Sequence, residues 1–188
     1  EIGSGLVGSE MCIRDSLDLS PFGEKYQDSA NAGNLDLIAA LEWIRDNIEG
    51  FGGDPENVTL FGQSGGGVKV WSLLQMPEAD GLFHKGIIES GVVDPDLLGD
   101  IEDGNGREIV KAMLAELGLE EKDVDQLETL PYDQLAQAYE NAAPKVAQKG
   151  EYVGNHPHKN QSYFGDAIKH GFREETKKIP LLIGTVLG

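Results

Sequence analysis

Residues 58–67, VTLFGQSGGG, decide which fold this chain is expected to adopt. The first four are suited to a buried strand, they lead into Gly-x-Ser-x-Gly, and a helix-compatible segment from Val68 to Met76 follows. Strand, sharp turn and helix in this order form a nucleophile elbow, with the serine hydroxyl exposed at its apex. Gly62 and Gly66 stand where we expect backbones so close that a side chain would clash. Ser64 is therefore the candidate nucleophile for acyl transfer.

The same stretch has a non-catalytic interpretation, which the local pattern leaves open. A Gly/Ser-rich turn, or a loop that holds a phosphate at a helix N-terminus, would have a similar composition. A P-loop is disfavoured, because no Gly-Lys-Ser/Thr follows the glycines.

The segments around the motif carry a resemblance to a known family. They are NAGNLDLIAALEWIRDNI at 31–48, FGGDPENVTLFGQSGGG at 51–67, FHKGIIESG at 83–91 and IPLLIGT at 179–185. Together they resemble the type-B carboxylesterases, which include bacterial para-nitrobenzyl esterases and the cholinesterases. The resemblance covers about residues 17–188 and is densest over 30–91. It implies a partial α/β-hydrolase fold, in which helices flank a mostly parallel sheet.

The resemblance also implies a serine carboxylic-ester hydrolase that works through an acyl-enzyme. Ser64 would attack a small-molecule ester, the backbone N–H of Gly65 would be one oxyanion-hole donor, and Ser90 would be a supporting hydroxyl near the triad. Many members carry Ala in place of Gly65, which keeps that N–H. For Ser90, a serine that simply ends a strand is an equal alternative. The implied mechanism needs no metal and no other cofactor.

Two further hypotheses follow from the resemblance. Some relatives of this fold have lost catalysis and serve as adhesion or binding modules, but they typically lack the nucleophile that this chain keeps. The family domain is also much longer than this chain, which is therefore expected to be an internal fragment. The triad acid, a glutamate, is expected at position 189, the histidine further on, and the upstream oxyanion loop before residue 17. We therefore expect the 188 residues alone to be inactive.

Residues 1–16 do not match the family and resemble translated sequencing-adaptor sequence, with a divergent native segment as the alternative. We therefore predict a non-native or unassigned segment at 1–16 and one domain fragment over 17–188. Within the fragment, a succession of short helices predicts a helical excursion from the sheet at about 94–147. Asp123 is expected to cap one of these helices.

The segments before and after this excursion predict a helix and two further strands. Apolar residues recur every three to four positions from Asn34 to Ile48, which indicates an amphipathic helix. Trp43 on this helix is interpreted as a packing residue rather than as a substrate-stacking one. Residues 86–91 and 179–184 are predicted to be strands. His84 is expected in a loop near the surface, without a catalytic role.

Composition excludes several classes of function. The net charge of −18 argues against nucleic-acid binding, which needs clusters of Lys and Arg. No apolar stretch approaches the length of a membrane span, and the single cysteine, Cys12, allows no disulfide framework. His156 and His158 invite a metal hypothesis, but without cysteine ligands or an HExxH helix a solvated loop is favoured. Localisation and oligomeric state stay unpredicted.

Overall fold

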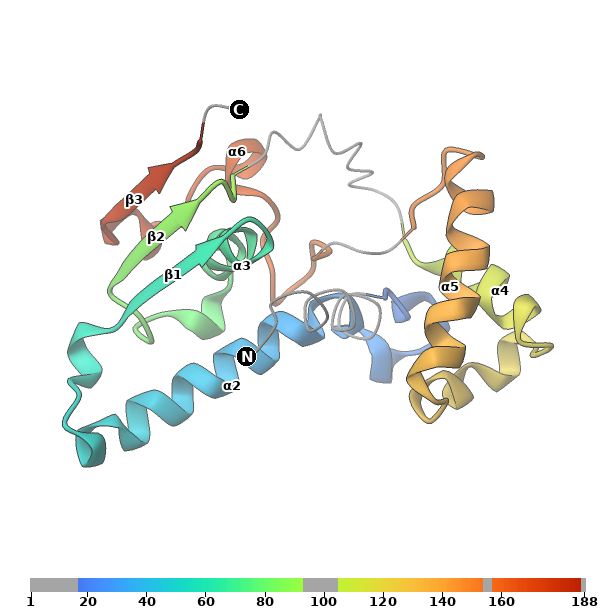
Figure 1. The fold of residues 1–188 in the computed structure, drawn as a ribbon, viewed down its shortest axis with the longest axis horizontal. Coiled ribbons are helices and arrows are strands. Elements are labelled where there is room, and N and C mark those ends of the chain that lie inside the picture. Colours follow the sequence, from blue (N-terminus) through green and yellow to red (C-terminus); the bar gives the residue numbers. More distant parts are fainter. Residues whose placement is uncertain (1–16, 93–104, 154–156, 187–188) are drawn as a thin grey trace. The chain divides into compact units, whose positions relative to one another are not determined.

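The computed structural model describes residues 17–92, 105–153 and 157–186, and the chain divides into two compact units (Figure 1). The sheet unit comprises residues 34–100 and 159–188, and the helical unit comprises 1–33 and 101–158. Each has its own cluster of buried apolar side chains. The predictions made for 1–16 and for His156 lie outside the described residues.

The sheet unit is built on three parallel strands in the order β1-β2-β3. They span Thr59–Gln63, Lys85–Glu89 and Leu181–Gly184, which confirms the three predicted strands to within one to two residues at most ends. Its helices are α2 (Ala32–Asn47), α3 (Gly65–Leu73) and the short α6 (Ala167–His170). Single turns of 3-10 helix occupy Ile48–Phe51, Pro55–Asn57, Pro77–Ala79 and Thr176–Lys178.

Helices cover one face of this sheet. α3 packs against β1 and β2, and its Val70 and Leu73 share a core with Ile88 of β2 and with Ile38 and Leu41 of α2. Side chains alternate across a strand, so every second residue of β1 points to the other face. That alternation puts the residues of the buried core and the exposed residues of β1 on opposite sides.

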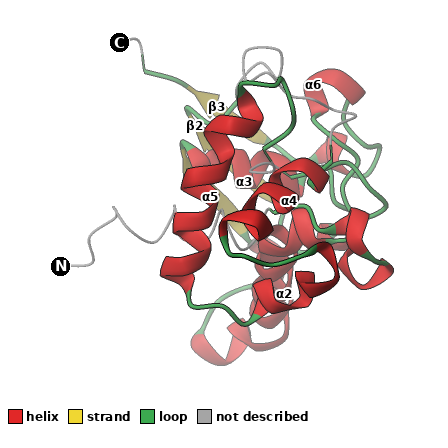
Figure 2. Ribbon diagram, turned by 90° about the vertical axis from the view of Figure 1, so that its right-hand side faces the viewer, coloured by secondary structure: helices red, strands yellow, loops and turns green. Residues whose placement is uncertain are grey.

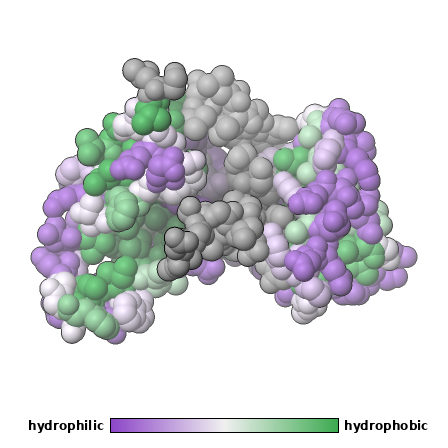
Figure 3. Space-filling view, in the orientation of Figure 1, coloured by the Kyte–Doolittle hydropathy of each residue, from purple (hydrophilic) through white to green (hydrophobic). Residues whose placement is uncertain are grey.

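The prediction that β1 is buried is wrong for that second face. Phe61 is 77% exposed and Leu182 of β3 is 66% exposed. On the face drawn in Figure 3, apolar residues cover more of the sheet unit than of the helical unit. A run of apolar residues predicts a strand that can be buried on both faces, but burial also requires a covering layer.

The interpretation of Trp43 as a packing residue is also wrong. Its side chain is 54% exposed, and its ring lies 6.0 Å from that of Phe51, which is itself 76% exposed. The two aromatic rings therefore form a pair on the surface rather than a part of the core.

The segment that leads from residue 159 to β3 is fastened to α3 by side chains. Trp71 donates its indole N–H to Asp166 Oδ2 (2.9 Å). Gln75 is almost fully buried, and its side-chain amide donates to the carbonyls of Gly165 (2.9 Å) and Gly171 (3.1 Å). These bonds fix both ends of the loop that contains α6.

The helical unit consists of α4 (Arg107–Glu116), a 3-10 segment η8 (Glu121–Glu128) and α5 (Tyr132–Ala147), with α4 and α5 side by side (Figure 2). Short 3-10 turns at Ser20–Phe22, Glu24–Tyr26 and Ser29–Asn31 precede them in the chain. Helices are confirmed in the described part, 105–147, of the segment predicted at about 94–147, and the rest of that segment lies outside the described residues. Asp123, however, is the third residue of η8 and not its N-cap. Its carboxylate accepts the backbone N–H of Glu120 (3.0 Å), which completes a capping box.

Within the described part of the chain, no helix combines the length and apolar character needed to cross a membrane. The division into two compact units does not test the predicted domain boundaries, so the single domain with a helical excursion stays a prediction.

Candidate active site

Ser64 stands at the junction between β1 and α3 in a strained backbone conformation. Its φ is 53° and its ψ is −120°, a combination that costs a non-glycine residue about 1–3 kcal/mol. Two backbone bonds hold it there: its N–H donates to the Glu89 carbonyl (2.8 Å), and its carbonyl accepts the Val68 N–H (3.0 Å). The residue is exposed, and its hydroxyl caps no amide of α3. The elbow therefore presents an exposed hydroxyl that takes no part in capping α3.

Close backbone contacts explain part of the glycine pattern around Ser64. A Cβ on Gly62 would lie 2.3 Å from the carbonyl carbon and oxygen of Gly66, so the predicted clash at Gly62 is confirmed. The same prediction for Gly66 is wrong, because a Cβ there would meet no atom within 4 Å. The second tight contact instead joins Gly67 and Gly91: a Cβ on Gly91 would lie 2.5 Å from the Gly67 Cα.

Gly65 is the first residue of α3 and follows Ser64 directly. Its backbone N–H is one of the N-terminal amides that an α-helix leaves without an intrahelical partner. The helix N-terminus also carries a partial positive charge, which favours a developing negative charge next to Ser64. A Cβ on Gly65 would meet no atom within 4 Å, so the alanine found in many family members would fit here.

Ser90 follows β2 as Ser64 follows β1. Gln63 and Glu89 are register partners in the parallel sheet, so both serines lie at the carboxyl edge of neighbouring strands. Ser90 also has a positive φ, 50°, and its N–H donates to the Gly184 carbonyl (2.7 Å). This strained backbone at Ser90 was not expected from the sequence. The available signal was the repetition of Ser-Gly after a strand, at 64–65 and at 90–91.

His84 lies at the opposite end of the strands from Ser64. Its ring Nδ1 accepts the backbone N–H of Val58 (3.2 Å), and the backbone N–H of His84 donates to the Val58 carbonyl (2.8 Å). Six residues of extended chain from Val58 to Ser64 correspond to about 20 Å. His84 therefore joins the beginnings of β1 and β2 and cannot act as a base for Ser64. It is half-buried, next to the exposed Glu56 (3.9 Å).

The other described histidines have neighbours of their own. His158 lies in the helical unit, with its ring 5.7 Å from that of Tyr152. His170 ends α6, and its Nδ1 lies 3.5 Å from Lys159 Nζ. Across the described residues, no three His, Cys, Asp or Glu side chains are arranged to hold a metal ion.

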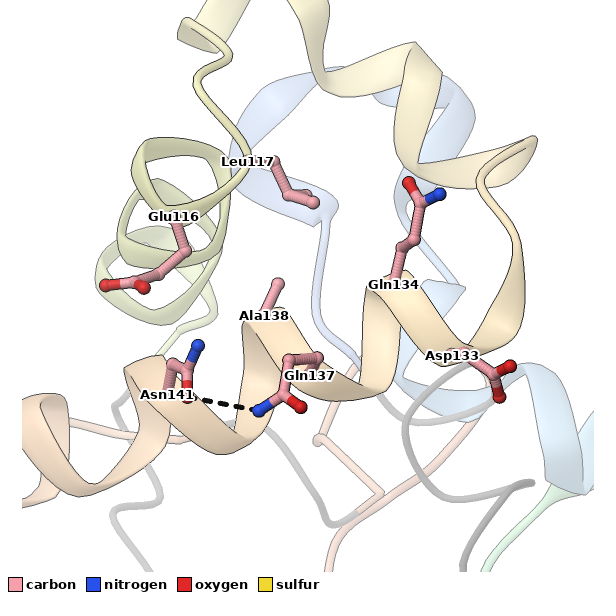
Figure 4. A pocket seen from close by; sticks show the side chains of 7 residues that line it. All are labelled: Glu116, Leu117, Asp133, Gln134, Gln137, Ala138 and Asn141. Atoms are coloured by element: carbon pink, nitrogen blue, oxygen red, sulfur yellow. Dashed lines mark hydrogen bonds between the residues drawn. The ribbon is translucent and has the colours of Figure 1, made fainter.

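A groove in the helical unit lies between α4 and α5 (Figure 4). Its side chains are mostly amides and carboxylates, and Gln137 Nε2 donates to Asn141 Oδ1 (3.2 Å) within it. None of the residues that line it is a serine, cysteine or histidine, so the groove has no nucleophile. It is lined by Glu116, Leu117, Asp133, Gln134, Gln137, Ala138 and Asn141.

Comparison with known proteins agrees with the elbow geometry. The model of the carboxylesterase family matches residues 23–187. The chain belongs to this family. It is 38% identical to the para-nitrobenzyl esterase of Bacillus subtilis, in an alignment that covers 90% of this chain and 33% of that protein. The family resemblance seen in the sequence is therefore confirmed.

Solved structures of this family share the fold. An esterase from Clostridium hathewayi, described as able to hydrolyse aliphatic aromatic polyesters, has a TM-score of 0.88 at 53% identity, over 94% of this chain and 35% of that one. A carboxylesterase from Geobacillus stearothermophilus has a TM-score of 0.70 at 31% identity, over 90% and 34%. The α/β-hydrolase fold is thus confirmed, and the chain spans about a third of the length of these relatives.

Proposed function

We propose that this chain carries the nucleophile of a carboxylic-ester hydrolase, and that Ser64 is that nucleophile. The observation that carries the proposal is the strained backbone of Ser64 between a parallel strand and a helix N-terminus. A binding module has no need to hold a serine in a backbone conformation that costs about 1–3 kcal/mol. Membership of the carboxylesterase family supports the same chemistry.

The proposed reaction passes through an acyl-enzyme. Ser64 Oγ attacks the ester carbonyl carbon while a histidine takes its proton, and the alcohol then leaves with a proton returned by that histidine. Water then attacks the carbonyl carbon of the acyl-enzyme while the histidine takes a proton from the water. The acid leaves as that proton is returned to Ser64 Oγ. The Gly65 N–H donates to the carbonyl oxygen as it becomes negative, and the α3 N-terminus adds a favourable field. Ser90 is proposed as a supporting hydroxyl at the same edge of the sheet.

The proposed substrate is a small-molecule ester. The Bacillus subtilis relative is named for para-nitrobenzyl esters, and the Clostridium hathewayi relative is described as acting on aliphatic aromatic polyesters. An ester with an aromatic group on one side is the class that both descriptions share, and it is the first to test on this chain.

A chimera tests the role of Ser64. Residues 17–186 would replace the matched third of the Bacillus subtilis para-nitrobenzyl esterase, and turnover of a para-nitrophenyl ester would be measured. We expect an active chimera that loses a factor of about 10⁴ or more in kcat with Ser64→Ala. Gly65→Ala serves as the matched control and should stay active. An active chimera whose turnover survives Ser64→Ala would overturn the proposal.

The 188-residue chain by itself is proposed to be inactive, because His84, the histidine between β1 and β2, lies at the opposite end of the strands from Ser64. We expect it to hydrolyse the same ester no faster than its own Ser64→Ala variant. Turnover well above that variant would show that a base is supplied within this chain, and it would refute the proposed need for further residues.

A further inference from the structure

The dipeptide Asn105-Gly106 stands directly before α4. In an Asn-Gly pair the backbone nitrogen of the glycine can attack the asparagine side-chain carbon Cγ, because glycine has no side chain to hinder the approach. The new C–N bond closes a succinimide, and the side-chain nitrogen leaves as ammonia. Water then opens the ring at either carbonyl and gives aspartate or isoaspartate. Sequence alone would mark Asn105 as a labile residue.

The structure holds the attacking nitrogen in place. The Gly106 N–H donates to Asp18 Oδ2 (2.8 Å), and Asp18 is 1% exposed. The other carboxylate oxygen, Oδ1, accepts the Ser20 N–H (2.9 Å), so the carboxylate is held at both ends. A Cβ on Gly106 would lie 1.8 Å from the Asp18 carbonyl oxygen, which shows how closely the two backbones pack.

The asparagine is held as well, although it is exposed to water. Its Oδ1 accepts the N–H of Arg107 (3.0 Å). The Gly106 carbonyl accepts the Val110 N–H (3.0 Å) as the first bond of α4. Closure of the succinimide would require the Gly106 nitrogen to give up its proton and to move toward Cγ. Both are opposed by an anionic acceptor that holds the proton in a buried site.

We infer that Asn105 is a deamidation site that Asp18 keeps closed in the folded protein. The reaction consumes one water and releases one ammonia for each asparagine converted, and it needs no other reagent. It starts when the bond between Asp18 and Gly106 opens. Its isoaspartate product places one extra methylene in the main chain directly before α4. That product cannot restore the contact between Gly106 and Asp18 without displacing the start of the helix.

The test follows the conversion of Asn105 in the full chain at mildly alkaline pH by peptide mass mapping. The folded protein should convert at least about tenfold more slowly than the same chain in urea, because a hydrogen bond to a charged acceptor must break first. Asp18→Ala should convert several-fold faster than the unaltered folded protein. Asp18→Asn, which keeps an oxygen acceptor without the charge, should fall between them.

A control separates this local effect from general loss of stability. Tyr26 lies in the same unit, and its hydroxyl lies within hydrogen-bond distance of the Asp125 and Glu128 carboxylates rather than of Asp18 or Gly106. Tyr26→Phe should therefore destabilise the unit without the acceleration caused by Asp18→Ala. Equal rates in the folded and unfolded chain would overturn the inference. So would acceleration in Tyr26→Phe that equals that in the Asp18 variants. If Asp18→Ala does not fold, Asp18→Asn against Tyr26→Phe decides the outcome.

Discussion

Two glycine-to-alanine substitutions in the elbow are expected to change stability in opposite directions. In Gly62→Ala the new Cβ would lie 2.3 Å from the Gly66 carbonyl group, which belongs to the backbone of α3 and can move only with the helix. Overpacking of this kind costs about 1–3 kcal/mol, occasionally more. In Gly65→Ala the Cβ meets no atom within 4 Å and φ is not positive. A gain of about 0.4–1 kcal/mol is expected from the lower entropy of the unfolded chain.

Tryptophan fluorescence is the appropriate assay because it follows one unit only. The chain has two tryptophans, Trp43 and Trp71, and both belong to the sheet unit. With a urea dependence of about 1–3 kcal/mol per molar, Gly62→Ala should lower the unfolding midpoint by roughly 1 M. Gly65→Ala should raise it by a few tenths of a molar. If Gly62→Ala unfolds at the same urea concentration as the unaltered chain, or at a higher one, the close approach described at the elbow is wrong.

Three other predictions concern the two cores and the open edge of the sheet. Burial raises the pKa of Tyr26 from 10.0 to about 12; its contribution to stability should be complete below pH 10 and lost toward pH 12, a loss that Tyr26→Phe should remove from the circular-dichroism profile. Asp80→Asn removes the carboxylate that pairs with the Arg173 guanidinium, whose side chain is 9% exposed, and leaves it with Glu175 at 3.5 Å and the charge of Glu78. It should cost about 3 kcal/mol by fluorescence-detected unfolding, against less than about 1 kcal/mol for Glu175→Gln at the exposed side. β1 is an edge strand of the sheet in the described residues and carries no charged side chain; Phe61→Lys should therefore reduce the aggregated fraction in sedimentation velocity, and a fraction equal to that of the unaltered chain would show that the β1 edge is not involved.

The elements that could be predicted from the sequence are those set by local patterns. The strand, turn and helix around Ser64 lie in one continuous stretch, and the glycine at 62 is required by a contact only four residues away. Apolar spacing predicts the helices of the helical unit. Gly118 follows the end of α4 with a φ of 71°, the left-handed conformation in which glycine commonly ends a helix. In each case the residues that decide the conformation are neighbours in the chain.

The features that the sequence did not reveal depend on residues far apart. Gln75 reaches the carbonyl of Gly165, ninety positions away, and a buried glutamine has no pattern that names its partner. The contact between Gly67 and Gly91 is of the same kind, because each glycine matters only where the other backbone passes. Exposure of Phe61 was mispredicted for a related reason: hydrophobicity states what a side chain prefers and not whether a layer covers it.

The difference between local and long-range contacts also applies to the proposed nucleophile, Ser64. Its position depends on one kind of contact and its reactivity on the other. Every contact described around Ser64 comes from residues 59–91, a single β-α-β arrangement whose strands pair directly. The strained serine is therefore held by contacts within this segment. Activation needs a base, and His84, the histidine within that stretch, lies at the far end of the strands. We therefore propose that Ser64 is positioned as a nucleophile by the β-α-β arrangement and is activated by groups outside it.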